Sequence, residues 1–114
     1  MSDCLFCKII NGDIPATKVF EDELIIAIED INPQAPTHLL IIPKKHLATT
    51  LELSSEDRQL IGEIFLRANK LAEERNIDQS GFRLVNNCQE GAGQSVFHIH
   101  FHLLGGRPMT WPPG

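Results

Sequence analysis

The sequence lacks long hydrophobic runs: no apolar stretch approaches the roughly 20 residues of a membrane-spanning helix. The first seven residues also lack the positive charge of a secretory signal, and Asp3 stands among them. These absences argue against both a membrane protein and an exported one. We therefore expect a cytoplasmic protein with no membrane partner.

Cysteine and positive charge are both scarce. The chain has three cysteines, an odd number that argues against a disulfide framework and leaves metal binding, catalysis or packing as their roles. The net charge is -5, and the only basic cluster is residues 44–46, which we interpret as a solvated loop. Because duplex binding usually needs a basic stripe, we expect no nucleic-acid partner.

The apolar residues that are present suffice for one modest core. The chain has 114 residues, 42% of them hydrophobic, which fits a single domain over residues 1–114. The patterns predict a short helix that Asp3 caps and that ends near residue 11, then an extended stretch from residue 19. Strands are predicted at residues 24–28, 38–42, 82–86 and 96–104, and a long amphipathic helix from the cap at 54–57 to about residue 75. This grouping favours an α+β fold with a mainly antiparallel sheet of about five strands.

The last predicted strand carries a row of histidines. Residues 97–103 alternate strictly, with histidine at 98, 100 and 102, and this is the period of a strand with one buried face. Phe97 would then lie on the core face, and three of the chain's five histidines would line the other face. An ordinary half-exposed strand would use Thr, Lys or Glu equally well there, so the concentration of histidine indicates a function.

Metal binding and nucleophilic catalysis are the two sharper interpretations of this row. At about 3.3 Å per residue the outer histidines stand roughly 13 Å apart, too far to share one ion, although two neighbours could. A neutral imidazole is available at pH 7 and is a recognised covalent nucleophile, while its neighbours can bond phosphate oxygens. Nucleophilic chemistry therefore fits the row better.

A glycine-rich loop at residues 91–95 precedes the row. Such a loop can turn successive backbone N–H groups toward an anion, and its small residues allow a phosphate to approach closely. By itself it is equally well a simple hairpin turn. Joined to the histidines, it predicts a phosphate site.

Cys4 and Cys7 are spaced for one face of a helical turn and could supply two ligands of a tetrahedral zinc ion. A redox pair would need a preceding strand in a βαβ unit, which the start of this chain does not offer. Two reduced thiols without metal are the remaining alternative. Cys88 fits a small apolar residue with no catalytic role.

These residues resemble the histidine triad (HIT) family and its nucleotide-binding branch, through His98, His100 and His102 followed by apolar positions. The resemblance extends over nearly the whole chain, through residues 30–38, 42–46, 93–96, 105–107 and 111–114. It implies a HIT-like fold with one short N-terminal helix, one long helix and a C-terminal arm at residues 104–114. A departure stands at Cys88 and Gln89, where many relatives carry an acidic residue and glycine, and it affects the expected leaving-group preference.

The resemblance implies a nucleoside phosphoramidase acting on adenosine 5'-monophosphoramidate or AMP joined to an amine. His100 would be the nucleophile, forming a nucleotidyl-histidine that water hydrolyses. His38 would lie behind His100 and tune or relay its proton, and Asp30 would accept the ribose hydroxyls. The phosphate site would comprise Asn87, or Asn86 with a one-residue shift, and Gly93, Gln94, Ser95, Val96 and His102. Ser95 would also help protonate the leaving amine. An apolar pocket for the base would comprise Phe6, Ile9, Ile14, Ile28, Ile31 and Leu40.

A structural zinc ion and a homodimer are also implied. Some bacterial relatives hold zinc through a cysteine pair and two histidines, which correspond here to Cys4, Cys7, His46 and His98; no organic cofactor is expected. The tail with Trp111 would reach toward the partner's site, and a dimer would cover an exposed sheet edge.

Two other functions remain open at this point. One is hydrolysis of dinucleoside polyphosphates, known in a sister branch of the family. The other is a nucleotide-binding regulatory module whose turnover is incidental. The ending Trp111-Pro112-Pro113-Gly114 favours the phosphoramidase.

Overall fold

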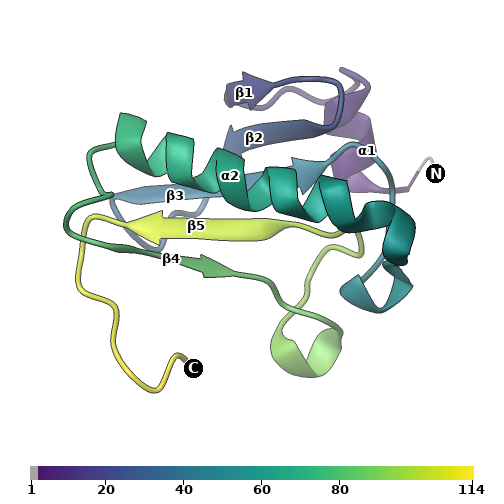
Figure 1. Cartoon of the computed structure of the whole chain (residues 1–114). Coiled ribbons are helices and arrows are strands. Elements are labelled where there is room, and N and C mark those ends of the chain that lie inside the picture. The colour runs from purple at the N-terminus through teal and green to yellow at the C-terminus, as the bar shows by residue number, and fades with distance from the viewer. Residues whose placement is uncertain (1–2) are drawn as a thin grey trace.

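The computed structural model describes residues 3–114. A five-stranded sheet runs in the order β1-β2-β3-β5-β4, and every neighbouring pair is antiparallel. The predicted fold class is confirmed. The elements, shown in Figure 1, are α1 (Leu5–Ile10), β1 (Lys18–Glu21), β2 (Ile25–Glu29), β3 (Thr37–Pro43), α2 (Arg58–Glu74), β4 (Phe82–Val85) and β5 (Phe101–Gly105). Short 3₁₀ turns lie at Thr50–Glu52, Ser55–Asp57 and Glu90–Ala92.

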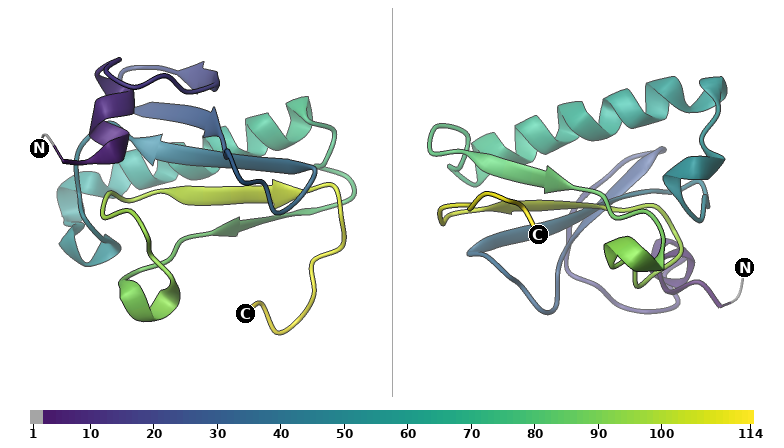
Figure 2. Two further views of the ribbon diagram at one scale, coloured as in Figure 1. Left: turned by 180° about the vertical axis from the view of Figure 1, so that it is seen from behind. Right: turned by 90° about the horizontal axis from the view of Figure 1, so that it is seen from below.

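The two helices cover opposite faces of this sheet, as the views in Figure 2 show. Successive residues of a strand point to opposite faces, so β2 and β3, which are apolar at almost every position, can fill two cores at once. Ile25, Ala27, Leu39 and Ile41 pack in the core that includes residues of α2. The alternate residues Ile26, Ile28, Leu40 and Ile42 pack with Phe6 and Ile9 of α1.

The long helix follows its sequence pattern closely. Its buried residues are Leu60, Ile64, Ala68, Leu71 and Ala72, which share one face at helical spacing. The chain enters it through a capping box in which the Asp57 carboxylate accepts a hydrogen bond from the backbone N–H of Ser54 at 2.9 Å. The predicted cap and the predicted end of this helix are both close to those observed.

Two local predictions are wrong. The cap of α1 is Cys4, whose sulfur accepts a hydrogen bond from the backbone N–H of Cys7 at 3.3 Å, rather than Asp3. The final strand begins at Phe101, so residues 96–100 lie outside it, and Phe97 is 46% exposed instead of buried. The partner strand β3 ends at Pro43, which has no N–H to extend the ladder, and Ile99 donates its N–H to Leu47 instead.

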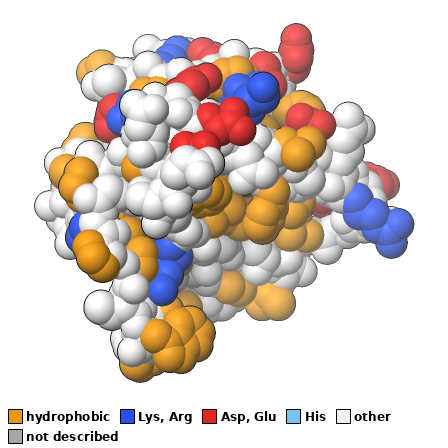
Figure 3. Space-filling view, turned by 60° about the vertical axis from the view of Figure 1, so that its left-hand side comes forward, with side chains coloured by type: hydrophobic (Ala, Val, Ile, Leu, Met, Phe, Trp, Pro, Cys, Tyr) orange, Lys and Arg blue, Asp and Glu red, His pale blue; other side chains and the backbone are white. Residues whose placement is uncertain are grey.

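The C-terminal segment leaves the sheet after Gly105 and crosses toward β4 (Figure 1). Arg83 of β4 donates a hydrogen bond to the carbonyl oxygen of Thr110 at 3.0 Å, and this bond attaches the C-terminal segment to the edge of the sheet. On the face drawn in Figure 3, charged side chains of both signs intermingle, and hydrophobic side chains form a band beside them. Within residues 3–114, no helix combines the length and apolar character needed to cross a membrane.

Candidate active site and metal cluster

Strands β3 and β5 bring His38 and His102 together. In their register Leu40 faces His102, so His38, two residues earlier on the same face, is the diagonal neighbour of His102. His38 Nε2 lies 2.9 Å from His102 Nδ1. The expectation that His38 lies behind His100 is therefore corrected: it lies against His102, because the pairing of the two strands sets this contact.

The backbone fixes the tautomers of these two rings. The N–H of Gln34 donates to His38 Nδ1 at 3.0 Å, so the proton of the neutral His38 ring is on Nε2. That Nε2–H donates to His102 Nδ1, and the proton of His102 is consequently on Nε2. The Asp30 carboxylate lies 3.4 Å from His38 Nε2 and completes the group.

His100 is held in the complementary tautomer. Its Nδ1 lies 2.8 Å from the carbonyl oxygen of His98, and a carbonyl only accepts, so His100 carries its proton on Nδ1. Its Nε2 therefore presents a lone pair. Among the described residues every fully buried polar side-chain atom has a partner, yet this Nε2 has none, so it is open to solvent although His100 is only 5% exposed.

Burial keeps these imidazoles neutral near pH 7. It lowers the pKa of His100 and of His38 below the ordinary histidine value. For His102, burial is again the main cause, and repulsion from His100 and His38 adds to it, which lowers the pKa to about 4. A neutral His100 is the form that can act as a nucleophile.

A cavity of about 350 Å³ opens beside His100 and His102. This volume lies within the range of small-ligand sites. All six residues predicted for the base pocket line it, together with Asp30, Ser95 and Val96. Sequence reasoning missed Leu5, Pro15, Ala16, Thr17 and Glu29. Of these, Leu5 carried a signal, because it stands four residues before Ile9 on the same face of α1.

The side chain of Gln94 does not line the cavity; it forms hydrogen bonds with backbone groups of its own loop and of a neighbouring segment. Its amide oxygen accepts from the N–H of Gln89 at 2.7 Å, and its amide nitrogen donates to the carbonyl of Ala48 at 2.7 Å. In the loop expected to present backbone donors, the N–H groups of Ala92 and Gln94 donate to the carbonyl of Gln89 and that of Gly93 donates to the carbonyl of Glu90, so these three are not free for a phosphate.

The two asparagines before this loop differ in their contacts. Asn86 donates its side-chain N–H to the carbonyl oxygen of His100 at 3.0 Å, which holds the backbone of the histidine segment. Asn87 makes no side-chain hydrogen bond within residues 3–114 and does not line the cavity. Trp111 is 82% exposed and lies outside the cavity lining of its own chain.

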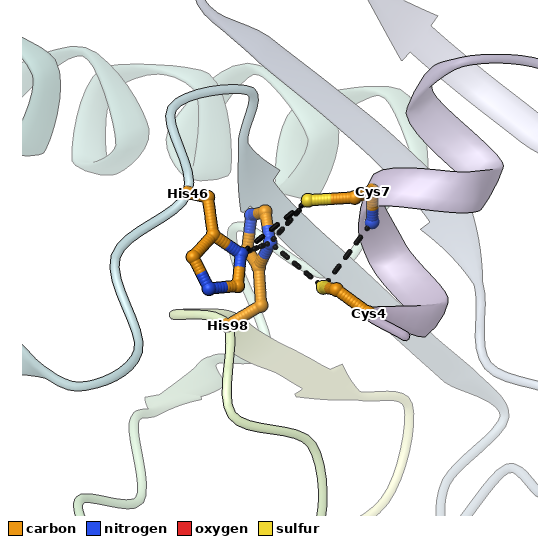
Figure 4. A group of neighbouring side chains, drawn as sticks. All are labelled: Cys4, Cys7, His46 and His98. Atoms are coloured by element: carbon orange, nitrogen blue, oxygen red, sulfur yellow. Dashed lines mark hydrogen bonds between the residues drawn. The ribbon is translucent and has the colours of Figure 1, made fainter. Parts of the chain in front are cut away.

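The predicted metal ligands Cys4, Cys7, His46 and His98 converge in one cluster (Figure 4). His98 Nδ1 lies 3.3 Å from the sulfur of Cys4 and 3.6 Å from that of Cys7. His46 Nδ1 lies 3.3 Å from the sulfur of Cys7 and 3.1 Å from His98 Nδ1. The four ligand atoms all lie within 4.8 Å of one another, as ligands around one small ion do.

The chemistry of this donor set fits a metal ion. His98 Nε2 lies 2.7 Å from the carbonyl oxygen of Pro43 and donates to it, so Nδ1 is left with its lone pair toward the two sulfurs. Cys4 and Cys7 are free of any disulfide. Two sulfurs and two imidazole nitrogens are a common set for tetrahedral zinc. The cluster could therefore bind a metal.

The chain is similar in sequence and in fold to other proteins. Residues 3–111 match the family model "Scavenger mRNA decapping enzyme C-term binding". The purine nucleoside phosphoramidase of Escherichia coli K12 is 46% identical over 107 residues, which are 94% of this chain and 90% of that protein. An uncharacterized HIT-like protein of Synechocystis is 49% identical over 112 residues, 98% of this chain and 97% of its own length.

Solved structures agree with these relatives. The crystal structure of a HIT family hydrolase from Legionella pneumophila superimposes with a TM-score of 0.97 at 60% identity, covering 98% of this chain and 100% of that one. A HIT family hydrolase from Clostridium thermocellum has a TM-score of 0.93 at 50% identity, with 96% of each chain covered. The chain belongs to the histidine triad (HIT) family.

Proposed function

We propose that this chain is a hydrolase that cleaves the P–N bond of adenosine 5'-monophosphoramidate or of AMP joined to an amine. The observation that carries the proposal is the lone pair of His100 Nε2, which the bond from Nδ1 to His98 leaves free and solvent-accessible at a cavity wall. The name of the 46% identical relative from Escherichia coli supports the same reaction.

In the proposed reaction, Nε2 of His100 attacks phosphorus and forms an N–P bond while the bond from phosphorus to the amine breaks. The amine leaves neutral after taking a proton, for which the hydroxyl of Ser95 in the cavity lining is the candidate donor. Water then attacks phosphorus and gives a proton back to the Ser95 oxygen, the bond to His100 breaks, and AMP is released with the His100 ring neutral again.

His102 and Asp30 have supporting roles. The Nε2–H of His102 donates to a phosphate oxygen, in the orientation that His38 fixes through Nδ1. The carboxylate of Asp30, a residue of the cavity lining, accepts the ribose hydroxyls. One of its oxygens accepts the N–H of Asn32 at 2.7 Å, and the other lies 3.4 Å from His38 Nε2. The apolar lining receives the purine base.

Rapid quenching of the wild-type protein with an AMP-amine, followed by mass spectrometry, tests the covalent step. We expect a nucleotide-mass adduct on His100 that acid removes, and neither adduct nor turnover in His100→Ala. Diadenosine polyphosphates serve as the comparison substrate. Faster cleavage of these would favour dinucleoside polyphosphate hydrolysis, and binding without turnover of either class would favour a regulatory module.

We further propose that Cys4, Cys7, His46 and His98 hold one structural zinc ion. Four protein ligands close the coordination shell, so the ion would supply rigidity and leave no position for substrate. A reducing cytoplasmic compartment would keep both cysteines out of disulfides, and each could then lose its proton and bind the ion as a thiolate. Elemental analysis of protein purified without a chelator or a metal-affinity tag checks this, and we expect about one zinc per chain.

We also propose a homodimer. β4 is an edge strand of the sheet, and an edge with free N–H and C=O groups tends to be covered. On α2, which packs beside the sheet, Phe65 is 51% and Leu66 is 60% exposed, and such side chains are commonly buried between subunits. The exposed Trp111 would then lie within reach of the partner. Analytical ultracentrifugation of wild type and Leu66→Lys measures this, with Leu51→Lys as the control, because Leu51 is 75% exposed and lies on a 3₁₀ turn outside α2 and β4.

A further inference from the structure

A second cavity of about 460 Å³ adjoins the one beside His100. We propose that it is the subsite for the leaving amine, and that it selects amines with an apolar chain ending in a positive charge. This inference rests on the proposed P–N hydrolysis. It concerns the part of the substrate that the nucleotide pocket leaves unspecified.

The position of this cavity follows from the walls that it shares. Ser95, Val96 and Leu5 line both cavities, while His100 and His102 line the first cavity alone. A phosphorus atom within reach of His100 has the nucleoside on the side of Asp30 and the apolar base pocket. The amine, which is bonded to the same phosphorus, then extends past Ser95, and a long amine continues into the second cavity.

The lining determines which amine fits. Leu5, Val96 and Phe97 are apolar. Leu5 is 43% and Phe97 is 46% exposed, so an apolar ligand chain could bury part of both side chains. Among the described residues that line this cavity, Asp3 is the one with a full charge. Its carboxylate makes no hydrogen bond or ion pair with other described residues. An alkyl chain ending in an ammonium group would satisfy both the apolar walls and this carboxylate.

The metal cluster does not offset this charge. Cys4 and His46 belong to the cluster and also line the second cavity. A zinc ion held by two thiolates and two neutral imidazoles has no net charge, because the two negative sulfurs balance the ion. Among the described residues of the lining, Asp3 therefore determines which charge the cavity attracts.

Three substrates separate this inference from the proposed function. Adenosine 5'-monophosphoramidate has no chain on its amine and reports the P–N reaction alone. AMP joined to hexylamine adds an apolar chain, and AMP joined to one nitrogen of 1,6-diaminohexane adds a chain with a terminal ammonium. The measurement is kcat/KM for each substrate at low and at high salt.

We expect the wild type to prefer the aminohexyl over the hexyl substrate by about two- to five-fold at low salt, the range of an exposed charge pair. High salt should reduce this ratio toward 1. Asp3→Asn should bring the ratio to about 1 at any salt. The control Asp13→Asn, which removes an exposed carboxylate after α1 that lines neither cavity, should keep the wild-type ratio. Phe97→Ala should lower kcat/KM for both chain-bearing substrates.

Each failure has a distinct meaning. If the wild type hydrolyses adenosine 5'-monophosphoramidate but shows no preference for the aminohexyl chain, the subsite is overturned and the proposed function stands. A preference that survives in Asp3→Asn also overturns the subsite. If the wild type cleaves none of the three substrates, the proposed function itself fails.

Discussion

The carbonyl oxygen of His98 accepts a hydrogen bond from Nδ1 of His100 at 2.8 Å. The imidazole of the same His98 lies within the metal cluster, 3.3 Å from the sulfur of Cys4. One residue thus joins the proposed zinc site to the proposed nucleophile. Any shift of His98 moves the carbonyl that fixes the tautomer of His100.

Loss of the metal should therefore reduce catalysis as well as stability. We expect Cys4→Ser to lose zinc, to lower the melting temperature by roughly 10 °C, and to lower kcat more than it raises KM. Zinc content, thermal unfolding and steady-state kinetics measure these three effects. Cys88→Ser is the matched control, because Cys88 is a free cysteine outside the cluster. Wild-type protein without zinc, or a Cys4→Ser variant with full activity, would contradict this prediction.

Asn86 should matter more for the site than its neighbour Asn87. Removing the bond from Asn86 to the His100 carbonyl should lower the free energy of unfolding by about 1 kcal/mol and lower kcat. Asn87→Ala removes no hydrogen bond within the described residues and should leave the free energy of unfolding unchanged. Urea denaturation and kinetics of the two variants check this. Equal destabilisation by both would show that the bond of Asn86 contributes little.

The sequence predicted best where one local pattern decides the outcome. The spacing of Leu60, Ile64 and Ala68 determines α2, and the apolar runs determine β2 and β3, because burial on both faces demands continuous apolar residues. The six base-pocket residues were predicted through the family resemblance. Taken by themselves, they are ordinary core residues.

The missed features depend on partners that are distant in sequence. The strand period of the histidine row fails before Phe101 because Pro43, 55 residues before His98, ends the ladder and accepts the bond from the His98 ring. His38 meets His102 across 64 residues, and only the register of β3 and β5 could reveal this contact. Gln94 is committed to Ala48, so its side chain is not free for phosphate.

His38 should act through the tautomer of His102. In His38→Leu no donor faces His102 Nδ1, and we expect kcat to fall about 10- to 100-fold, as when a partner that orients a functional imidazole is removed. His38→Gln can place an amide N–H near the same atom and should recover part of the loss. The pair of variants is compared by kcat, with thermal unfolding to confirm the fold. Equal kcat in the two variants would show that His38 does not act by fixing the tautomer of His102.

The low pKa of His102 should make part of the stability depend on pH. Its pKa is about 4 in the folded chain and 6.5 at the ordinary histidine value, so between these limits the unfolded chain binds more protons. The free energy of unfolding should therefore be level above pH 6.5 and fall as the pH decreases toward 4. His102 alone would account for at most about 2 kcal/mol of this loss between pH 7.5 and pH 5.

The wild type and His102→Gln isolate this contribution when both are unfolded by urea at pH 7.5 and at pH 5. Glutamine does not titrate, so the variant should lose less stability on acidification than the wild type does, and the difference between the two proteins should shrink at pH 5. Parallel loss in both would mean that His102 keeps an ordinary pKa in the folded chain. His102 would then become protonated as the pH falls through the ordinary histidine value, and a protonated Nδ1 could no longer accept the hydrogen bond from His38.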